Sequence, residues 1–113
     1  MHDVLVKSGP WSDPITAQCP VAETLRTLGS KHGALVLHCL TKGEMFFLEL
    51  ARELNGVSHK VLRAQLKDFE DSGLIVRSPK NDSRRRVGYA LTEKGQALGS
   101  ILEKLFDWSQ TYP

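Results

Sequence analysis

A tight turn at Asn55, Gly56 and Val57 constrains the fold more than any other feature of this sequence, because it separates two apolar helical segments. Asn-Gly is a strong turn signal, since both residues tolerate left-handed backbone conformations. Ser58 follows at once, and its hydroxyl can cap a helix by accepting backbone N–H bonds. Apolar residues recur at helical spacing on both sides of the turn, first as Phe47, Leu48, Leu50, Ala51 and Leu54, then as Leu62, Leu66 and Phe69. We therefore expect a helix, a tight turn and a second, capped helix.

The chain before this motif contains an arm and two predicted helices. Residues 1–16 hold two prolines and two serines without a sustained apolar period, so we expect a loosely ordered N-terminal arm. A single domain is expected over residues 17–113. Within it, Pro20 to Leu28 and Lys31 to Leu40 show helical apolar patterns, and a glycine soon follows each of them as a stop signal.

Two short β-type segments follow the capped helix. Residues 74–80 and 85–91 are separated by a polar tip, which indicates a β-hairpin. Met45 and Phe46 are expected to form a further short strand, and Thr92 to cap a final helix. Helix, turn, helix and hairpin is the order of a winged helix-turn-helix, whose second helix enters the DNA major groove. We predict a mainly α fold with a small β-hairpin of this kind.

Positive charge is concentrated in one third of the chain. The net charge is only +2, yet residues 58–94 hold nine basic and five acidic side chains, whereas the rest of the chain is net acidic. Such an asymmetry is expected for a surface that meets a polyanion. A solvated charged face would account for the charge count equally well.

Basic side chains fall on one face of the capped helix and at one bend of the hairpin. At about 100° per residue, the polar face of that helix lies opposite its leucines and carries mainly cations. Three adjacent arginines near the hairpin tip can meet phosphates or enter the minor groove, although strand alternation gives the middle one a different direction. The candidate DNA-binding residues are Ser58, His59, Lys60, Arg63, Ala64, Lys67, Arg84, Arg85 and Arg86.

Other interpretations of these residues stay open. The arginines could be a solubilising hairpin tip, and His59 an exposed turn residue. Winged folds also serve as protein–protein adaptors that do not bind DNA. An adaptor need not present a basic helix face and an arginine-rich hairpin on one side, whereas a DNA reader must neutralise several phosphates. Sequence-specific DNA binding is therefore the favoured prediction.

An enzyme, a metal protein and a membrane protein are not indicated. The four histidines are scattered, and no nucleophile, base and orienting group occur at a recognised spacing, so we expect neither catalysis nor a metal or cofactor. Two cysteines do not make a disulfide framework. With no leader and no apolar run long enough to cross a bilayer, we expect a cytoplasmic protein.

The final helix carries more apolar positions than one contact with its own core requires. We therefore predict a homodimer, in which part of this face packs against a second subunit. Two recognition helices must lie about 34–36 Å apart to read successive major grooves, which a dimer provides. The candidate dimerisation residues are Leu98, Ile101, Leu102, Leu105, Phe106 and Trp108.

Three stretches together resemble the HxlR family of bacterial transcriptional regulators. They are CPVAETLRTLGSK from Cys19, SHKVLRAQLKDFEDSGLIVR from Ser58 and VGYALTEKGQAL from Val87. The likeness covers residues 19 to 112, with Cys-Pro-Val, Ser-x-Lys-x-Leu and Tyr-x-Leu-Thr-x-x-Gly in the family's order. His32 stands where the family commonly has Trp, and the hairpin tip carries more arginine than is usual.

The resemblance implies a homodimer that binds an operator, usually as a repressor and sometimes as an activator, with its terminal segments forming the dimer. Some members sense electrophiles or oxidants through the cysteine that corresponds to Cys19, so a small-molecule or oxidant effector is implied. A physical reason exists, because N–H groups at a helix N-terminus stabilise a thiolate ahead of Pro20. Packing at the dimer seam is the alternative for Cys19. Cys39, inside an apolar helix, is predicted to be inert.

Overall fold

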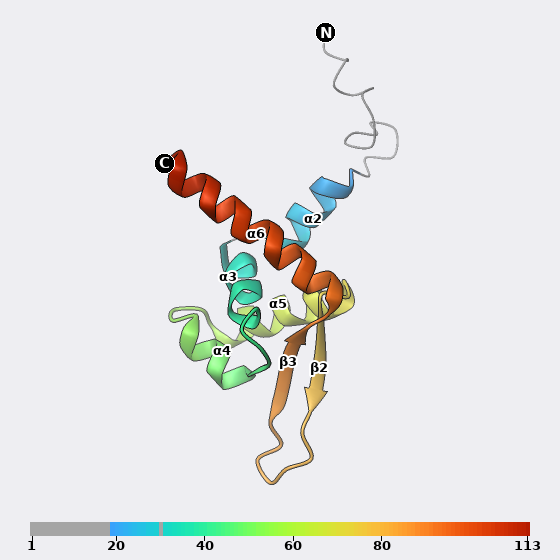
Figure 1. Cartoon of the computed structure of the whole chain (residues 1–113). Coiled ribbons are helices and arrows are strands. Elements are labelled where there is room, and N and C mark those ends of the chain that lie inside the picture. The colour runs from blue at the N-terminus through green and yellow to red at the C-terminus, as the bar shows by residue number, and fades with distance from the viewer. Residues whose placement is uncertain (1–18, 30) are drawn as a thin grey trace.

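The computed structural model describes residues 19–29 and 31–113, so the predicted arm over residues 1–16 lies outside the described residues. In this part of the chain, five helices and a three-stranded antiparallel sheet form one body with a projecting hairpin (Figure 1). The elements in chain order are α2 (Pro20–Leu28), α3 (Lys31–Leu40), β1 (Met45–Phe46), α4 (Phe47–Glu53), α5 (His59–Asp71), β2 (Ile75–Pro79), β3 (Val87–Leu91) and α6 (Glu93–Thr111). The predicted winged helix-turn-helix is confirmed.

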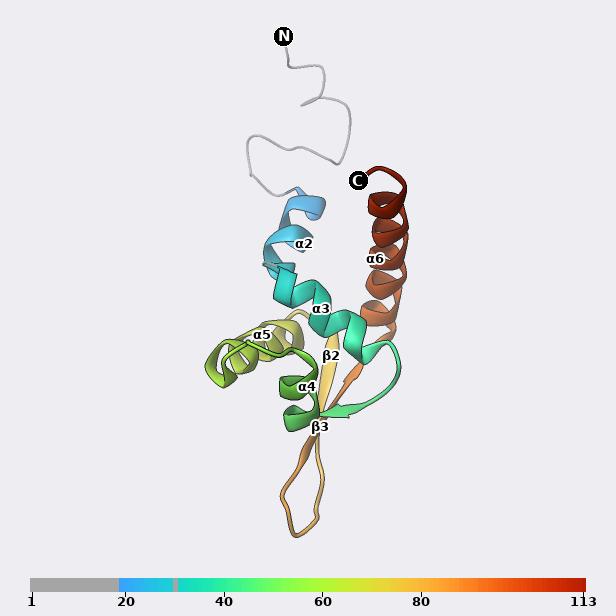
Figure 2. The same cartoon turned by 90° about the vertical axis from the view of Figure 1, so that its left-hand side faces the viewer.

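The sheet joins the hairpin to the helical body. Its strand order is β1-β3-β2, so β3 lies in the centre although it comes last in the chain. β2 and β3 pair from Ile75 opposite Leu91 to Pro79 opposite Val87, and β1 adds only two residues, with Phe46 opposite Gly88. We call β2, β3 and their connecting loop the wing. Its tip and the C-terminal end of α6 lie at opposite ends of the molecule (Figures 1 and 2).

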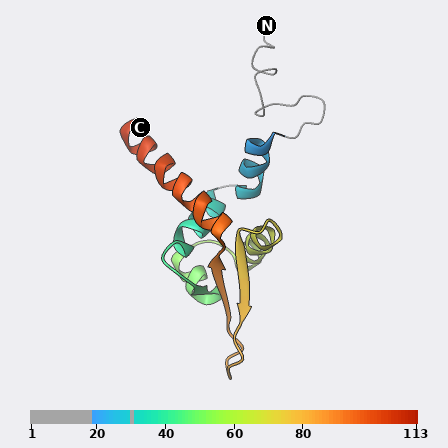
Figure 3. The ribbon, with the colours of Figure 1, turned by 45° about the vertical axis from the view of Figure 1, so that its right-hand side comes forward.

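The hydrophobic core lies between α3, α4, α5 and the base of the wing. The predicted apolar face of α5 is confirmed, because Leu62, Leu66 and Phe69 are almost fully buried. Burial of one such side chain stabilises the fold by about 1.5–3 kcal/mol. Leu74 and Ile75 continue this core into β2, and α5 lies beside the start of that strand (Figure 3). The other buried core residues are Leu28, Val36, Leu37, Leu40, Leu50, Leu54 and Tyr89.

The first turn of α6 is packed tightly on the base of the wing. The Thr92 hydroxyl accepts a hydrogen bond from the Gly95 N–H at 3.1 Å and donates to the Gly73 carbonyl at 2.6 Å, so the predicted cap also ties two segments together. A Cβ at Gly95 would lie 2.1 Å from the Leu74 carbonyl oxygen. Glycine is therefore required here because backbone approaches backbone, although alanine is normally the better helix former.

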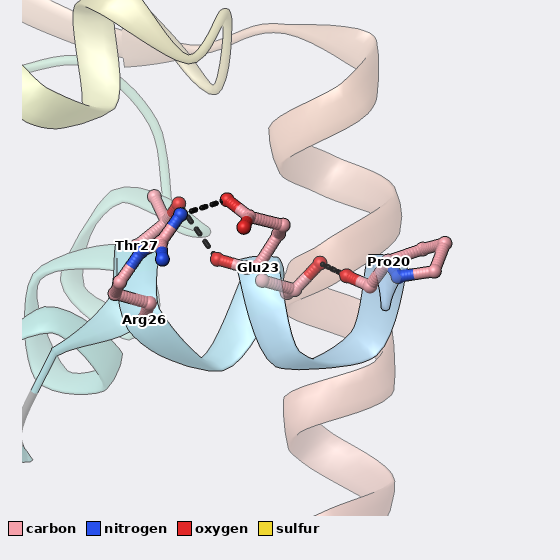
Figure 4. A network of polar contacts seen from close by, with 5 residues as sticks. Pro20, Glu23, Arg26 and Thr27 are labelled. Carbon is pink, nitrogen blue, oxygen red and sulfur yellow. Dashed lines mark hydrogen bonds and ion pairs between the residues drawn. The ribbon is translucent and has the colours of Figure 1, made fainter. Parts of the chain in front are cut away.

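Helix α2 begins and ends as predicted. Pro20 occupies its first turn, where the missing N–H costs nothing, and Gly29 follows its last residue in a left-handed conformation. Within the helix, Thr27 donates to the Glu23 carbonyl at 3.0 Å and Glu23 pairs with Arg26 (Figure 4). In the part of the chain that the structure describes, no helix is long and apolar enough to cross a membrane.

Candidate nucleic-acid interface

The turn between α4 and α5 sets how the second helix starts. Gly56 has φ +97°, a conformation that favours glycine, and the Val57 N–H donates to the Leu54 carbonyl at 3.0 Å. The Ser58 hydroxyl accepts a hydrogen bond from the Val61 N–H at 3.0 Å, as the sequence predicts for an N-cap. The N-terminal end of α5 is thus well defined and exposed to solvent.

The polar face of α5 is exposed along its length. Lys60, Arg63, Ala64 and Lys67 are all exposed, while the leucines of the opposite face are buried. These cations are not equivalent, because Lys67 Nζ lies 3.1 Å from Asp71 Oδ1, and this hydrogen bond raises the pKa of Lys67. Among the described residues, no acidic side chain forms an ion pair with either of the other two cations. Available positive charge is therefore greatest in the N-terminal half of α5.

Asp82 organises the wing tip. Its carboxylate accepts hydrogen bonds from Arg86 Nε at 2.8 Å and from the Arg86 N–H at 3.2 Å, and its carbonyl accepts from the Arg85 N–H at 3.1 Å. The side-chain hydrogen bond from Arg86 lowers the pKa of Asp82, so the carboxylate is charged at neutral pH. Arg84 and Arg85 form no ion pair within the described residues. The three arginines therefore have different environments.

Arg85 has an unusual backbone conformation. Its φ of +51° makes it the one non-glycine residue with positive φ among those described. A side chain in the left-handed region costs about 1–2 kcal/mol, and such residues concentrate at functional sites. The sequence indicated that Arg85 differs from its neighbours through strand alternation. The structure shows a different reason, since Arg85 lies in the turn and not in β3.

A concave surface joins α4, α5 and the wing. It encloses about 580 Å³ and is lined by six arginines and one glutamate among the described residues. Guanidinium groups suit such a site because their planar donor pattern binds phosphate in a bidentate manner. We call this surface the arginine basin, and its charged residues are Glu49, Arg52, Arg63, Arg77, Arg84, Arg85 and Arg86.

The basin brings some predicted residues together and adds two that were missed. Arg63 of α5 and the three wing arginines share it, whereas the other α5 candidates lie outside its lining. Arg52 on α4 and Arg77 on β2 were not predicted. A signal existed for Arg77, because strand alternation and its pairing opposite Tyr89 fix its face, but only once the register is known.

The two cysteines lie in different surroundings. Cys19 is the N-cap residue of α2 and is partly exposed, and its carbonyl accepts a hydrogen bond from the Glu23 N–H at 2.9 Å. Cys39 lies in α3 and packs against the core. Burial raises the pKa of the Cys39 thiol, and the nearby Glu53 carboxylate adds to this, so less of the reactive thiolate forms.

The apolar residues of α6 divide between two faces. Leu98 and Leu102 pack against the chain's own core, whereas Ile101, Leu105, Phe106 and Trp108 are each more than half exposed. Beside them, a mainly apolar groove of about 420 Å³ runs between α3 and α6. This part of α6 therefore presents apolar side chains that the described chain does not cover.

Comparison with known proteins identifies relatives. The sequence model of a family described as HxlR-like helix-turn-helix matches residues 27–113. YtfH of Escherichia coli (strain K12), an uncharacterised HTH-type transcriptional regulator, is 34% identical over 91 residues, which cover 80% of this chain and 72% of YtfH. The HTH-type transcriptional regulator YodB of Bacillus subtilis (strain 168) is 30% identical over 95 residues, covering 83% of this chain and 85% of YodB.

Solved structures show the same fold. The redox regulator HypR in its reduced form has a TM-score of 0.76 at 27% identity, covering 81% of this chain and 91% of HypR. The reduced form of YodB has a TM-score of 0.73 at 29% identity, covering 84% of this chain and 94% of YodB.

Replacement of Arg85 by glycine separates backbone strain from charge. For Arg85→Gly we expect a free energy of unfolding equal to that of the wild type or up to about 1 kcal/mol higher, because glycine relieves the left-handed strain at some entropic cost. Affinity for duplex DNA should nevertheless fall. The slope of log K against log salt concentration should become smaller in magnitude by about one unit. Chemical denaturation and fluorescence anisotropy measure the two effects. In the control Arg84→Gly, stability should decrease instead, and a loss of stability in Arg85→Gly would contradict the strain argument.

Proposed function

The chain belongs to the HxlR-like helix-turn-helix family of DNA-binding transcriptional regulators, and we propose that it binds an operator with α5 in the major groove and the wing on the flanking backbone. The observation that supports this most directly is the arginine basin, because it joins the exposed face of α5 to the wing on one side of the molecule. A protein–protein adaptor would not need such a continuous cationic surface.

The roles proposed for α5 follow from its exposed face. Lys60, Arg63 and Lys67 contact base edges and phosphates of the major groove, and a bidentate Arg63 suits guanine. Ala64 is short enough to admit a close approach and can meet a thymine methyl group. Ser58 and His59, at the start of the helix, donate hydrogen bonds to backbone phosphates, since phosphate contacts set the register of a recognition helix.

The roles proposed for the wing separate its arginines. Arg84 and Arg85 project charge that is not neutralised by an acidic side chain of the described residues, so they are the phosphate or minor-groove contacts. Arg86 holds the tip in shape through Asp82 and adds a third cation. Arg52 and Arg77, across the basin, extend the phosphate-binding surface beyond the residues predicted from sequence.

Operator binding would also determine where the protein works and how it affects transcription. A regulator of this kind works in the cytoplasm beside the chromosome, and occupancy of an operator that overlaps a promoter would repress transcription. Repression is the commoner role implied by the family resemblance, and no catalytic step is part of this proposal.

A homodimer is proposed from the exposed face of α6. Ile101, Leu105, Phe106 and Trp108 are unfavourably exposed to water, and the C-terminal end of α6 lies on the opposite side of the molecule from the wing tip (Figure 1). Pairing through this face leaves both basins free, and two-fold symmetry would present two recognition helices to successive major grooves.

A redox response through Cys19 is the second proposed function. Two observations favour it: Cys19 is partly exposed at a helix N-terminus, and the related HypR is described as a redox regulator. Modification at this position would add bulk or charge at the start of α2, and α2 is tied to α5 by a hydrogen bond of 3.3 Å from Gln65 Nε2 to the Thr27 carbonyl. A change at α2 can therefore reach the DNA-binding helix.

Salt dependence tests the operator proposal. Binding to duplex DNA from upstream of the chain's own gene should weaken steeply with salt, because each neutralised phosphate contributes about −0.9 to the slope of log K against log salt concentration. Arg84→Gln should reduce the magnitude of this slope by about one unit. Lys104→Gln, which removes an exposed cation from α6, is the control and should leave the slope unchanged. A flat salt response of the wild type would exclude a phosphate-binding basin.

Light scattering tests the dimer. The wild type should be a dimer at micromolar concentration, and Phe106→Glu should be a monomer with unchanged circular dichroism, because a buried carboxylate would lack a partner. Glu103→Gln, at a neighbouring exposed position, should remain a dimer. A wild-type monomer under these conditions would contradict the proposed dimer.

Mass spectrometry after mild diamide exposure tests the redox response. Cys19 should be modified first, and DNA should be released in the same range of diamide concentration. Cys19→Ser should keep its DNA bound, whereas Cys39→Ser should respond like the wild type, because burial disfavours the Cys39 thiolate. Release of DNA while Cys19 stays unmodified would place the sensor elsewhere.

A further inference from the structure

Two adjacent phenylalanines at the junction of β1 and α4 each hold a guanidinium group. The Cζ atom of Arg63, on α5, lies 4.6 Å from the ring centroid of Phe47. The Cζ atom of Arg86, on the wing, lies 4.4 Å from the ring centroid of Phe46. Both distances are well inside the limit of about 6 Å for a cation–π interaction. One dipeptide therefore touches a cation of the recognition helix and a cation of the wing.

The backbone of Phe46 and the ring of Phe47 are themselves held in place. The Phe46 N–H donates to Glu49 Oε1 at 2.8 Å, and Phe46 pairs with Gly88 across the sheet. Phe47 packs against the core and meets the ring of His59 edge-on, with centroids 5.2 Å apart and planes at 89°. The backbone of Phe46 is fixed by its two contacts, and the Phe47 ring cannot turn away from Arg63 without losing its own packing.

Without the Phe47 ring, the guanidinium group of Arg63 would be tethered only by its long, flexible side chain. Arg86 has a second anchor in Asp82, at 2.8 Å from Nη2, whereas Arg63 forms no ion pair within the described residues. An arginine loses conformational entropy when it binds a phosphate or base, and prior ordering by a ring reduces that loss. A ring face does this without neutralising the charge or occupying the N–H donors.

We propose that Phe46 and Phe47 are positioning residues that hold Arg86 and Arg63 in a fixed mutual arrangement for DNA. This inference rests on the DNA binding proposed above and assigns a role to two apolar residues within the arginine basin. The rings order the cations before DNA arrives, so that the groove contact of α5 and the backbone contact of the wing form together. The dipeptide links the two reading elements.

The test is a pair of double-mutant cycles in the full chain. Phe47→Leu removes the π face but keeps an apolar side chain, and Phe47→Tyr keeps the ring. With duplex DNA from upstream of the chain's own gene, we expect Phe47→Leu to bind about two- to fivefold more weakly than the wild type. Phe47→Tyr should bind with wild-type affinity. In an Arg63→Gln background, Phe47→Leu should cause no further loss. The cycle of Phe46→Leu with Arg86→Gln should behave in the same way.

The salt slope of binding distinguishes a positioning role from a general structural role. The leucine variants should keep the wild-type slope, because the number of cations is unchanged, whereas each arginine variant should reduce its magnitude by about one unit. Equal losses of affinity from the leucine substitutions with and without the arginines would overturn the proposal. Thermal unfolding confirms that each variant is folded, and if one pair fails to fold, the other pair decides.

The salt dependence of wild-type binding distinguishes failure of the DNA-binding proposal from failure of the positioning role alone. If its own binding is insensitive to salt, the DNA-binding proposal fails and the positioning role fails with it. If wild-type binding is steeply salt-dependent and the mutant cycles are additive, only the role of the phenylalanines is overturned.

Discussion

The burial of one face of α5 is the interaction on which the rest of the structure depends. Leu62, Leu66 and Phe69 are at most 2% exposed, and a rotation of the helix about its axis would bring at least one of them into water. Each would lose about 1.5–3 kcal/mol of transfer free energy, a large share of the stability of a small domain. The orientation of the helix is therefore fixed, and so is the direction of Lys60 and Arg63.

A much smaller contact adds to the buried residues Leu74, Ile75 and Tyr89 in placing the wing. Strand β1 contributes two residue pairs to the sheet, and the ion pair between Lys80 and Glu44, at 2.9 Å, adds a second link between the wing and the segment before β1. Both partners of that ion pair are partly exposed, so its contribution is modest. The consequence is geometric: β1 runs directly into α4, and the base of the wing is thereby placed against the helix-turn-helix.

Local features of this fold could be predicted from sequence because they depend on neighbouring residues. The Asn-Gly turn, the caps at Ser58 and Thr92 and the apolar face of α5 each follow from signals within a few positions. The arginine basin could not be predicted in full. Arg77 joins it through the strand order β1-β3-β2, in which the middle strand comes last in the chain, and Arg52 joins it from α4, which follows β1. No local pattern contains that information.

Two other features could not be predicted from the apolar periodicity of the sequence, for different reasons. In α6 the apolar residues cover more than one face, and helical spacing alone does not say which face meets the chain's own core; the structure places Leu98 and Leu102 there. At the wing tip, positive φ is rare for arginine, so sequence gave no reason to expect it at Arg85. The first outcome is decided by tertiary contacts with the core, whereas the second accompanies the hydrogen bonds that Asp82 accepts from Arg85 and Arg86.

The cations of α5 and of the wing differ in what they can contribute to binding. Lys67 and Arg86 each have a carboxylate partner, at 3.1 and 2.8 Å, so a phosphate must compete with Asp71 or Asp82 for them. The first pair is exposed and the second is partly exposed, so this competition is weak, but it still favours the unpaired groups as the main source of affinity. Arg63, Arg84 and Arg85 would then supply most of the phosphate binding, while Arg86 keeps the wing tip in shape. A surface that sets geometry with some cations and binds with others can be both ordered and strongly positive, which a cluster of unpaired arginines alone would not achieve, because like charges repel.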